Sequence, residues 1–215
     1  MALYRALRTH FGHRHWWPGE TPFEVMVGAV LTQNTNWGNV EKAILNLKSA
    51  GKLSPRGIDA MPETEIAALI RPSGYFNVKA RRLKSLVRRF IEKCGGDERN
   101  FRRVPTRKLR EELLDVNGVG RETADSILLY ALGRRIFVVD AYTRRVFCRH
   151  GFLRGGEDYD EIRVMFESLL PRSAPLYNDY HAQIVAVGKG YCAPRRPRCA
   201  GCPLGRFKPR AEKTK

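Results

Sequence analysis

Apolar residues recur at helical spacing along most of this chain. They fall three or four positions apart between Phe23 and Leu31, and again between Leu83 and Phe90. This spacing puts them on one face of an α-helix, and Gly or Pro interrupts the pattern at short intervals. The one β-like run, residues 136–139, is too short to found a sheet. We therefore predict an all-α fold built from short helices.

The chain is strongly basic, which narrows the kinds of partner to expect. Its 215 residues include 39 Lys and Arg against 22 Asp and Glu, a formal net charge of +17. A surface of this charge favours a polyanionic partner, and nucleic acid is the commonest one. A ribosomal protein, or a charge that only keeps the protein soluble, would give the same composition. The motifs have to decide between these alternatives.

Targeting signals are not evident in the sequence. Arg5 and Arg8 interrupt the apolar pattern of the first residues, so these do not form the apolar part of a signal peptide. No run of about 18 apolar residues is present, and we expect no membrane partner. Three of the five cysteines cluster near the end of the sequence. This favours a reducing cytoplasm and a metal site over a disulfide framework.

Residues 113–133 combine a helix end, a Gly-x-Gly turn and a new amphipathic helix. Gly118 and Gly120 flank Val119, and without Cβ atoms they let backbone amides converge on one anion. A phosphate group fits such a turn. Many helical hairpins, however, use Gly-x-Gly only to reverse the chain.

A second motif follows the hairpin, Val-Val-Asp-Ala-Tyr-Thr-Arg-Arg at residues 138–145. Together the two motifs resemble the endonuclease III family of base-excision DNA glycosylases. The segment from Leu31 to Thr35 and the late cysteines also stand where that family has them, so the resemblance covers nearly the whole chain. It implies a six-helix barrel over residues 21–132 that ends in the hairpin. Residues 1–20 and 133–215 would form a second helical lobe, with Asp140 in the cleft between the lobes.

By this resemblance Asp140 is the catalytic carboxylate. Breaking an N-glycosidic bond builds positive oxocarbenium character on the deoxyribose, which a nearby carboxylate stabilises while it orients or deprotonates the attacking water. Asp140 would also suit the N-cap of a helix that begins near Tyr142. The two roles are compatible.

The resemblance also implies a partner and the residues that bind it. The expected partner is double-stranded DNA with a damaged base, bound by a monomer in the cytoplasm at the bacterial nucleoid. The residues expected to contact DNA come from the hairpin and the second motif: Asn117, Gly118, Val119, Gly120, Arg121, Thr123 and Arg144.

One residue departs from the pattern of family members that also nick DNA. Those members carry a lysine two positions after the second hairpin glycine, where this chain has Glu122. A carboxylate cannot form a Schiff base with the sugar, so a monofunctional enzyme is implied. Glu122 either lines the base pocket or is a favourable acidic residue in the first turn of a helix, and we favour the second. Ala29 stands where mispair-adenine glycosylases carry an acid, which argues against adenine excision.

The tryptophans lie early in the chain, at Trp16, Trp17 and Trp37. Clustered tryptophans most often pack in a core. However, residues 15–18, 28–35 and 71–80 resemble the bacterial 3-methyladenine glycosylase branch, in which aromatic residues at these positions sandwich the alkylated base. A purine methylated at N3 or N7 is cationic, and indole faces attract cations. By the same resemblance Gln33 fills the space left by the flipped nucleotide; the alternative is an ordinary surface residue.

The predicted function is therefore release of alkylated purines, 3-methyl or 7-methyl, from duplex DNA without strand cleavage. The first alternative is an endonuclease III-type glycosylase for oxidised pyrimidines, with lyase activity through a lysine that the sequence does not place. The second is a DNA-binding module without turnover, against which the presence of Asp140 argues.

The spacing of Cys192, Cys199 and Cys202 matches the first three ligands of the family's iron-sulfur loop. The fourth cysteine would fall at Lys208. A 4Fe–4S cluster normally takes four thiolates, so a zinc site, an unusual fourth ligand and an empty loop stay open beside the cluster that we favour. Its expected role is structural, holding loop arginines towards phosphates.

Overall fold

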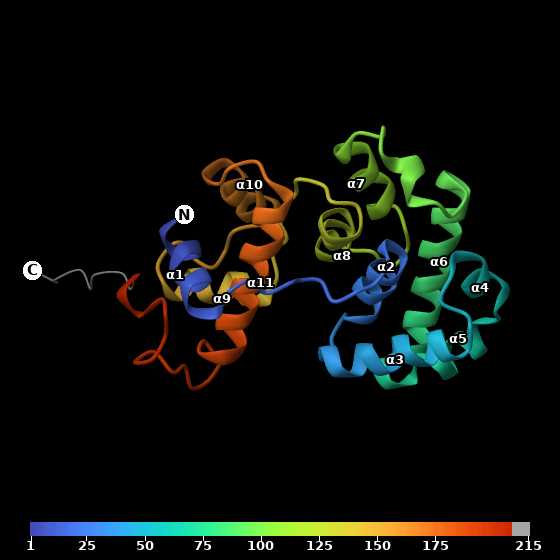
Figure 1. Cartoon of the computed structure of the whole chain (residues 1–215), viewed down its shortest axis with the longest axis horizontal. Coiled ribbons are helices and arrows are strands. Elements are labelled where there is room, and N and C mark those ends of the chain that lie inside the picture. The colour runs from blue at the N-terminus through green and yellow to red at the C-terminus, as the bar shows by residue number, and fades with distance from the viewer. Residues whose placement is uncertain (208–215) are drawn as a thin grey trace, which may run out of the picture. The chain divides into compact units, whose positions relative to one another are not determined.

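The computed structural model describes residues 1–207, and Lys208 and the residues after it lie outside the described part. Residues 1–207 form helices joined by short turns, with no β-strand (Figure 1). The all-α prediction is confirmed. Residues 136–139, the β-like run, are extended and buried but take part in no sheet within this range.

The α-helices are α1 (Ala2–Phe11), α2 (Pro22–Leu31), α3 (Trp37–Ser49), α4 (Pro55–Ala60), α5 (Glu63–Leu69), α6 (Phe76–Cys94), α7 (Thr106–Leu114), α8 (Arg121–Ser126), α9 (Ala141–Arg149), α10 (Tyr159–Leu169) and α11 (Ala174–Gly190). Short turns of other helix types are η1 (Arg71–Ser73), η2 (Glu98–Phe101), η3 (Ile127–Ala131) and η4 (Gly205–Phe207). None of the helices in the described residues is long and apolar enough to cross a membrane.

The chain forms two compact units. The middle unit is Trp17–Arg134, and the terminal unit combines Met1–Trp16 with residues 135–207. The boundaries expected from the sequence fell after residues 20 and 132. The hairpin belongs to the middle unit, and Asp140 belongs to the terminal unit.

The middle unit is built around α2, which is buried along nearly its whole length. Thr21 caps its start by accepting a hydrogen bond from the Glu24 amide, and Pro22 takes the first turn, where an amide donor is not needed. Around α2 pack α3, α6, α8 and η3. Together they bury one continuous apolar core that fixes the hairpin at its edge.

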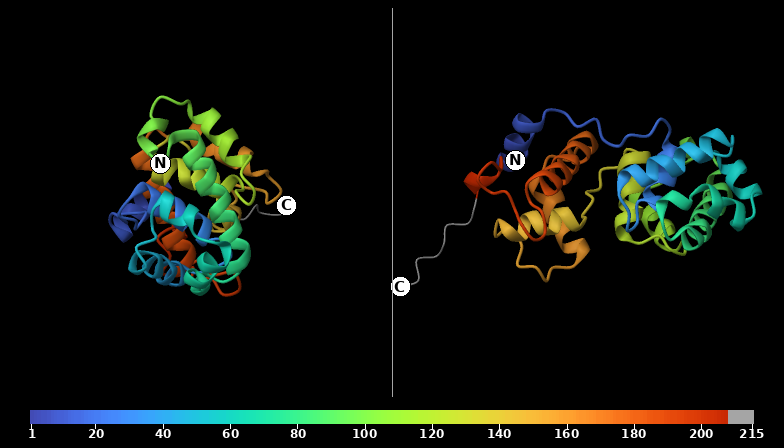
Figure 2. Two further views of the ribbon diagram at one scale, coloured as in Figure 1. Left: turned by 90° about the vertical axis from the view of Figure 1, so that its right-hand side faces the viewer. Right: turned by 90° about the horizontal axis from the view of Figure 1, so that it is seen from below.

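The terminal unit is built around α11, which packs against both α1 and α9. Although they come from opposite ends of the sequence, α1 and α11 lie side by side (Figures 1 and 2). The Tyr4 hydroxyl donates to Asp179 Oδ2 at 2.9 Å, and Arg8 Nε lies 3.5 Å from the same oxygen. These contacts tie the start of the chain to a helix near its end.

Candidate active site

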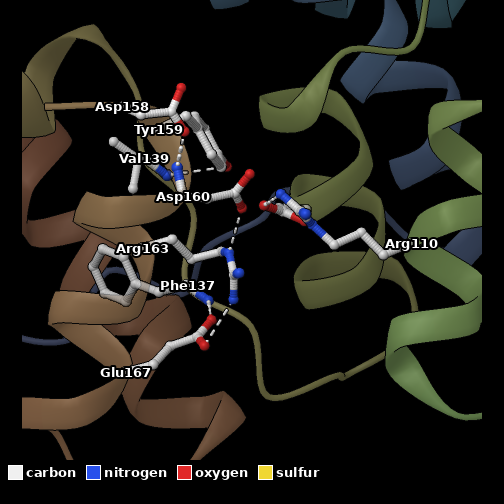
Figure 3. A network of polar contacts seen from close by, with 9 residues as sticks. Arg110, Phe137, Val139, Asp158, Tyr159, Asp160, Arg163 and Glu167 are labelled. Atoms are coloured by element: carbon white, nitrogen blue, oxygen red, sulfur yellow. Dashed lines mark hydrogen bonds and ion pairs between the residues drawn. The ribbon is translucent and has the colours of Figure 1, made fainter.

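The extended segment before Asp140 is held by side chains instead of by a neighbouring strand (Figure 3). The Phe137 amide donates to Glu167 Oε1 at 2.9 Å, and the Val139 amide donates to the Tyr159 hydroxyl at 3.3 Å. The Phe137 ring stacks on Phe166, with ring centroids 4.1 Å apart. The main chain that leads into Asp140 is therefore fixed at two amides and one ring.

The partners of this segment come from α10 and are themselves held in place. Arg163 lies 2.8 Å from Glu167 Oε2 and 3.0 Å from Asp160 Oδ1, so one guanidinium joins both carboxylates (Figure 3). At the start of α10, Asp158 and Glu161 form a reciprocal capping box. A rigid α10 thus supports the approach to Asp140.

Asp140 is the N-cap of α9. Its Oδ1 accepts hydrogen bonds from the Thr143 amide at 2.7 Å and from Thr143 Oγ1 at 2.9 Å. The capping role expected from the sequence is confirmed, and the helix begins at Ala141. The Asp140 side chain is 11% exposed, so this carboxylate is largely shielded from water.

The second oxygen of Asp140 faces a histidine. Oδ2 lies 3.5 Å from Nε2 of His181, a residue of α11 whose side chain is 6% exposed. Burial raises the pKa of Asp140, but His181 and the hydrogen bonds from Thr143 outweigh burial, and the pKa lies below its usual range. The group is therefore an ionised carboxylate at neutral pH, able to stabilise a developing positive charge.

An aromatic cluster lies in the middle unit. The rings of Trp17 and Trp37 meet edge to face, with centroids 5.1 Å apart, and the Trp17 ring lies 5.1 Å from that of Tyr130. All three side chains are only partly buried. Gly28 in α2 lets Trp17 lie close, because a Cβ there would be 3.3 Å from the indole nitrogen. The cluster combines electron-rich faces with access to solvent.

Among the three tryptophans predicted to bind the base, Trp17 and Trp37 contact each other within the middle unit. Trp16 is half-buried and belongs to the terminal unit, whereas Trp17 and Trp37 belong to the middle unit. The third aromatic ring of this cluster is Tyr130, which lies against Trp17. None of the tryptophans is a fully buried core residue.

The hairpin turn between α7 and α8 requires a glycine for two reasons. Gly118 has φ +84°, in the left-handed region. A Cβ on Gly118 would also lie 2.2 Å from Cγ of Arg82. Val119 is buried in the apolar core and anchors the turn, whereas Asn117 and Arg121 are exposed. The turn is thus anchored in the core through Val119 and presents polar side chains to solvent.

Gln33 fastens the end of α2 to this turn. Its Nε2 donates to the Gly118 carbonyl at 3.1 Å and to Thr123 Oγ1 at 3.0 Å, and its Oε1 accepts a hydrogen bond from Arg82. Thr123 is 7% exposed. Both ends of the Gln33 amide are therefore engaged within the fold, although the residue is only partly buried. Filling the gap left by a flipped nucleotide stays a prediction for Gln33.

Two further predicted residues lie in separate units. Glu122 is exposed in the first turn of α8, in the position that favours an acidic side chain. Arg144 belongs to α9, immediately after Thr143, and its Nη1 donates to the Glu157 carbonyl at 2.8 Å. One nitrogen of the Arg144 guanidinium therefore binds the loop before α10.

The predicted cluster ligands do not form a metal site in the described residues. Cys192 is buried, with Sγ 3.3 Å from Arg149 Nη1, while Cys199 is exposed. Within residues 1–207, no three His, Cys, Asp or Glu side chains gather as a metal ion requires. The position expected for a fourth ligand, Lys208, lies outside the described residues. The iron-sulfur cluster therefore stays a prediction.

Hydrogen bonds from arginines hold the cysteine loop instead. Arg145 Nε donates to the Cys192 carbonyl at 2.7 Å, and Arg149 Nη1 donates to the Ala193 carbonyl at 2.7 Å. The Arg198 amide donates to the Tyr191 carbonyl at 2.7 Å. The loop therefore has fixed points that do not depend on a metal.

Three residues of these sites were not identified from the sequence: His181, Tyr130 and Arg82. Each contacts a residue that was predicted from the sequence, namely Asp140, Trp17 and Gln33 respectively. Because the two residues of each pair are far apart in the sequence, no local motif includes both. One signal was available for His181, which is a polar residue in a largely apolar helix. Such residues are buried with a partner or carry function.

The chain is similar to known DNA repair proteins. A provisionally named DNA repair glycosylase of Methanocaldococcus jannaschii is 48% identical over 206 residues, 95% of this chain and 93% of that protein. The structure of the H. pylori 3-methyladenine DNA glycosylase bound to 1,N6-ethenoadenine superposes with a TM-score of 0.75 at 33% identity, covering 87% of this chain and 96% of that one. A non-covalent complex of endonuclease III with DNA gives a TM-score of 0.80 at 26% identity, covering 96% and 92%.

The family model described as HhH-GPD superfamily base excision DNA repair protein matches residues 27–172, a range that includes the hairpin, Gln33 and Asp140. The chain therefore belongs to this superfamily of DNA repair glycosylases.

Proposed function

We propose that the protein is a monofunctional DNA glycosylase that hydrolyses the N-glycosidic bond of 3-methyl and 7-methyl purines in duplex DNA. The observation that carries the proposal is the partly exposed aromatic cluster of Trp17, Trp37 and Tyr130. N3- and N7-methylated purines are cations, and the faces of indole and phenol rings attract cations. A flipped base that stacks on these rings gains from both stacking and charge.

The chemistry requires little beyond a carboxylate. Methylation has already weakened the glycosidic bond, so the base leaves with the bonding electron pair and needs no general acid. A water oxygen bonds to C1′ of the sugar, the proton that this water loses passes to the solvent, and the product is an abasic site. We assign to Asp140 the stabilisation of the oxocarbenium charge and the orientation of this water, because its carboxylate is ionised and shielded.

The absence of a lysine at position 122 supports hydrolysis without strand cleavage. Glu122 stands at the start of α8, and a carboxylate forms no imine with the sugar. Water is then the nucleophile, and the reaction stops at the abasic site without cutting the DNA strand.

In this proposal the hairpin binds the DNA backbone. Backbone amides around Gly118 and Gly120, with Arg121 beside them, would bind a phosphate, and the basic surface would add salt-dependent affinity. Arg144 stays a proposed DNA contact on the same grounds. The iron-sulfur cluster at the late cysteines stays a prediction, and no step of the proposed reaction passes through it.

A second candidate function has one observation in its favour. The similarity to endonuclease III bound to DNA spans 96% of this chain, slightly more than the similarity to the 3-methyladenine glycosylase. A glycosylase and lyase for oxidised pyrimidines would fit that similarity.

A base-release assay on a panel of duplexes distinguishes the two candidates. We expect release from duplexes that carry 7-methylguanine or 3-methyladenine, no release from duplexes with an oxidised pyrimidine, and no covalent complex after borohydride. The Asp140→Asn variant should lose release by about 100-fold or more while it binds an abasic duplex as the parent does. Borohydride trapping on an oxidised pyrimidine would support the endonuclease III-type function instead.

A further inference from the structure

The two oxygens of Asp140 have different surroundings. Oδ1 accepts two hydrogen bonds from Thr143, both within one turn of the same helix. Oδ2 lies 3.5 Å from His181 Nε2, across from another helix. The cap holds Oδ1 and His181 faces Oδ2, so contacts on both oxygens restrain rotation of the carboxylate about its Cβ–Cγ bond.

His181 differs in its surroundings from the other buried polar residues of α11. Asp179 accepts a hydrogen bond from the Tyr4 hydroxyl, and Gln183 Nε2 donates to the Gly12 carbonyl at 2.6 Å. Both residues therefore bind the amino-terminal segment. His181 lies towards Asp140, with its ring edge-on to Phe137 at 6.4 Å between centroids. Phe137 belongs to the segment that leads into Asp140. His181 thus packs against the extended segment that leads into Asp140.

We infer that His181 is a positioning residue for glycosidic hydrolysis, with its Nε2–H directed at Asp140 Oδ2 to hold the carboxylate in one orientation. The inference rests on the function proposed above. Nε2 carries a hydrogen in the imidazolium ring and in one of the two neutral tautomers, so it can donate in either charge state.

The orientation matters because the carboxylate acts at short range. A group that stabilises a transition state contributes most when it is fixed before the reaction and needs no reorganisation. Removing the histidine donor would leave Oδ2 buried with a weaker set of partners. Burial then favours protonation of Asp140, and a neutral carboxyl group stabilises a positive charge poorly.

Single-turnover release of 7-methylguanine from a duplex tests the inference with three variants of the full chain. His181→Phe keeps a ring of similar size without a donor, and His181→Leu is a second variant without a donor. His181→Gln restores an N–H near the position of Nε2. The matched control is Gln183→Leu, which removes a buried polar group two positions along the same helix.

We expect the rate constant of release to fall about 10- to 100-fold in the variants without a donor, the usual effect of losing a hydrogen bond to a charged group. Binding of an abasic duplex should change by less than about threefold. His181→Gln should recover most of the rate, and Gln183→Leu should keep the parent rate even where its melting temperature falls.

Two results would overturn the inference. The first is a variant without a donor that releases the base at the parent rate. The second is a loss of rate that follows melting temperature across all four variants, the control included. Failure of the proposed function is distinct: the parent would then release no methylated purine, and the same variants would be measured on whichever lesion the parent does process.

Discussion

Lys79 shows how one buried cation can hold a turn. It is 1% exposed, and its Nζ donates to the Leu31 carbonyl at 2.8 Å and to the Ser73 carbonyl at 2.6 Å. Leu31 is the last residue of α2, where carbonyls lack helical partners, and a cation is favourable at that end of a helix. Burial, and then the positive charge of Arg82, lower the pKa of Lys79 to about 8.

This lowered pKa makes stability depend on pH. Above pH 8 the folded protein has released the Lys79 proton, whereas the unfolded chain, with the ordinary pKa of 10.5, still holds it. Raising the pH through this range therefore stabilises the fold through this group, by up to about 1.4 kcal/mol per pH unit. Urea unfolding near pH 7 and near pH 9 should show the parent gaining stability relative to Lys79→Met. An equal gap between the two proteins at both pH values would contradict the lowered pKa.

The aromatic cluster predicts a selective defect at Trp37. Removing one face of the proposed stack by Trp37→Ala should slow release of 7-methylguanine by the equivalent of about 1 to 3 kcal/mol, while abasic duplex binding stays nearly unchanged. Phe90→Leu, in the core of the same unit, is the comparison: it should lower melting temperature without a selective defect. The stacking role fails if Trp37→Ala lowers stability, binding and release together.

At the scale of elements, the hairpin depends on an element far from it in sequence. Arg82 of α6 covers Gly118 and also donates to Gln33 at the end of α2. The turn is therefore held by contacts from two helices, Arg82 of α6 and Gln33 at the end of α2. Such a clamp fixes the amides that would meet a phosphate.

Gly118→Ala tests this clamp. The positive φ and the clash with Arg82 together should cost about 1 to 3 kcal/mol of the free energy of unfolding. Because Arg82→Ala removes the clash but leaves the strain, the double variant should lose less than the sum of the single variants. Gly120→Ala is the control, since φ is negative there and no atom lies within 4 Å of an added Cβ. Strict additivity would show that the close approach has no energetic effect.

The cysteine loop gives a prediction about metal removal. Since arginines hold its main chain, protein treated with a strong chelator should keep its melting temperature within a few degrees and should still release the base. Iron analysis before and after treatment shows whether metal was present at all. Loss of activity together with stoichiometric iron loss would establish a cluster that the three described cysteines share with a further ligand.

Local chemistry explains which elements could be predicted from sequence. The cap at Asp140 and the turn at Gly118 depend on residue types within a few positions, and helical periodicity is equally local. His181 and Tyr130 reach their partners across long stretches of chain, and no short pattern encodes that approach. The sequence also gives no sign that Trp16 and Trp17, which are adjacent, fall in different units.

For the whole molecule, the net charge of +17 predicts steep salt dependence of DNA binding. The logarithm of affinity should fall linearly with the logarithm of salt concentration, and Arg121→Gln at the hairpin should reduce that slope by about one. Arg99→Gln is the control, because it removes one positive charge at a position outside the hairpin. Equal slopes for the parent and Arg121→Gln would remove Arg121 from the DNA contacts.

The pairing of α1 with α11 sets an order of events during synthesis. Ribosomes make α1 before α11, and its partner Asp179 is added 175 positions after Tyr4. All of Trp17–Arg134, one continuous stretch that forms a compact unit, is made in between. Helix α1 is therefore synthesised well before the helix that it packs against. A nascent chain that stops before Ala174 contains α1 and the whole middle unit but lacks α11, the helix against which α1 packs.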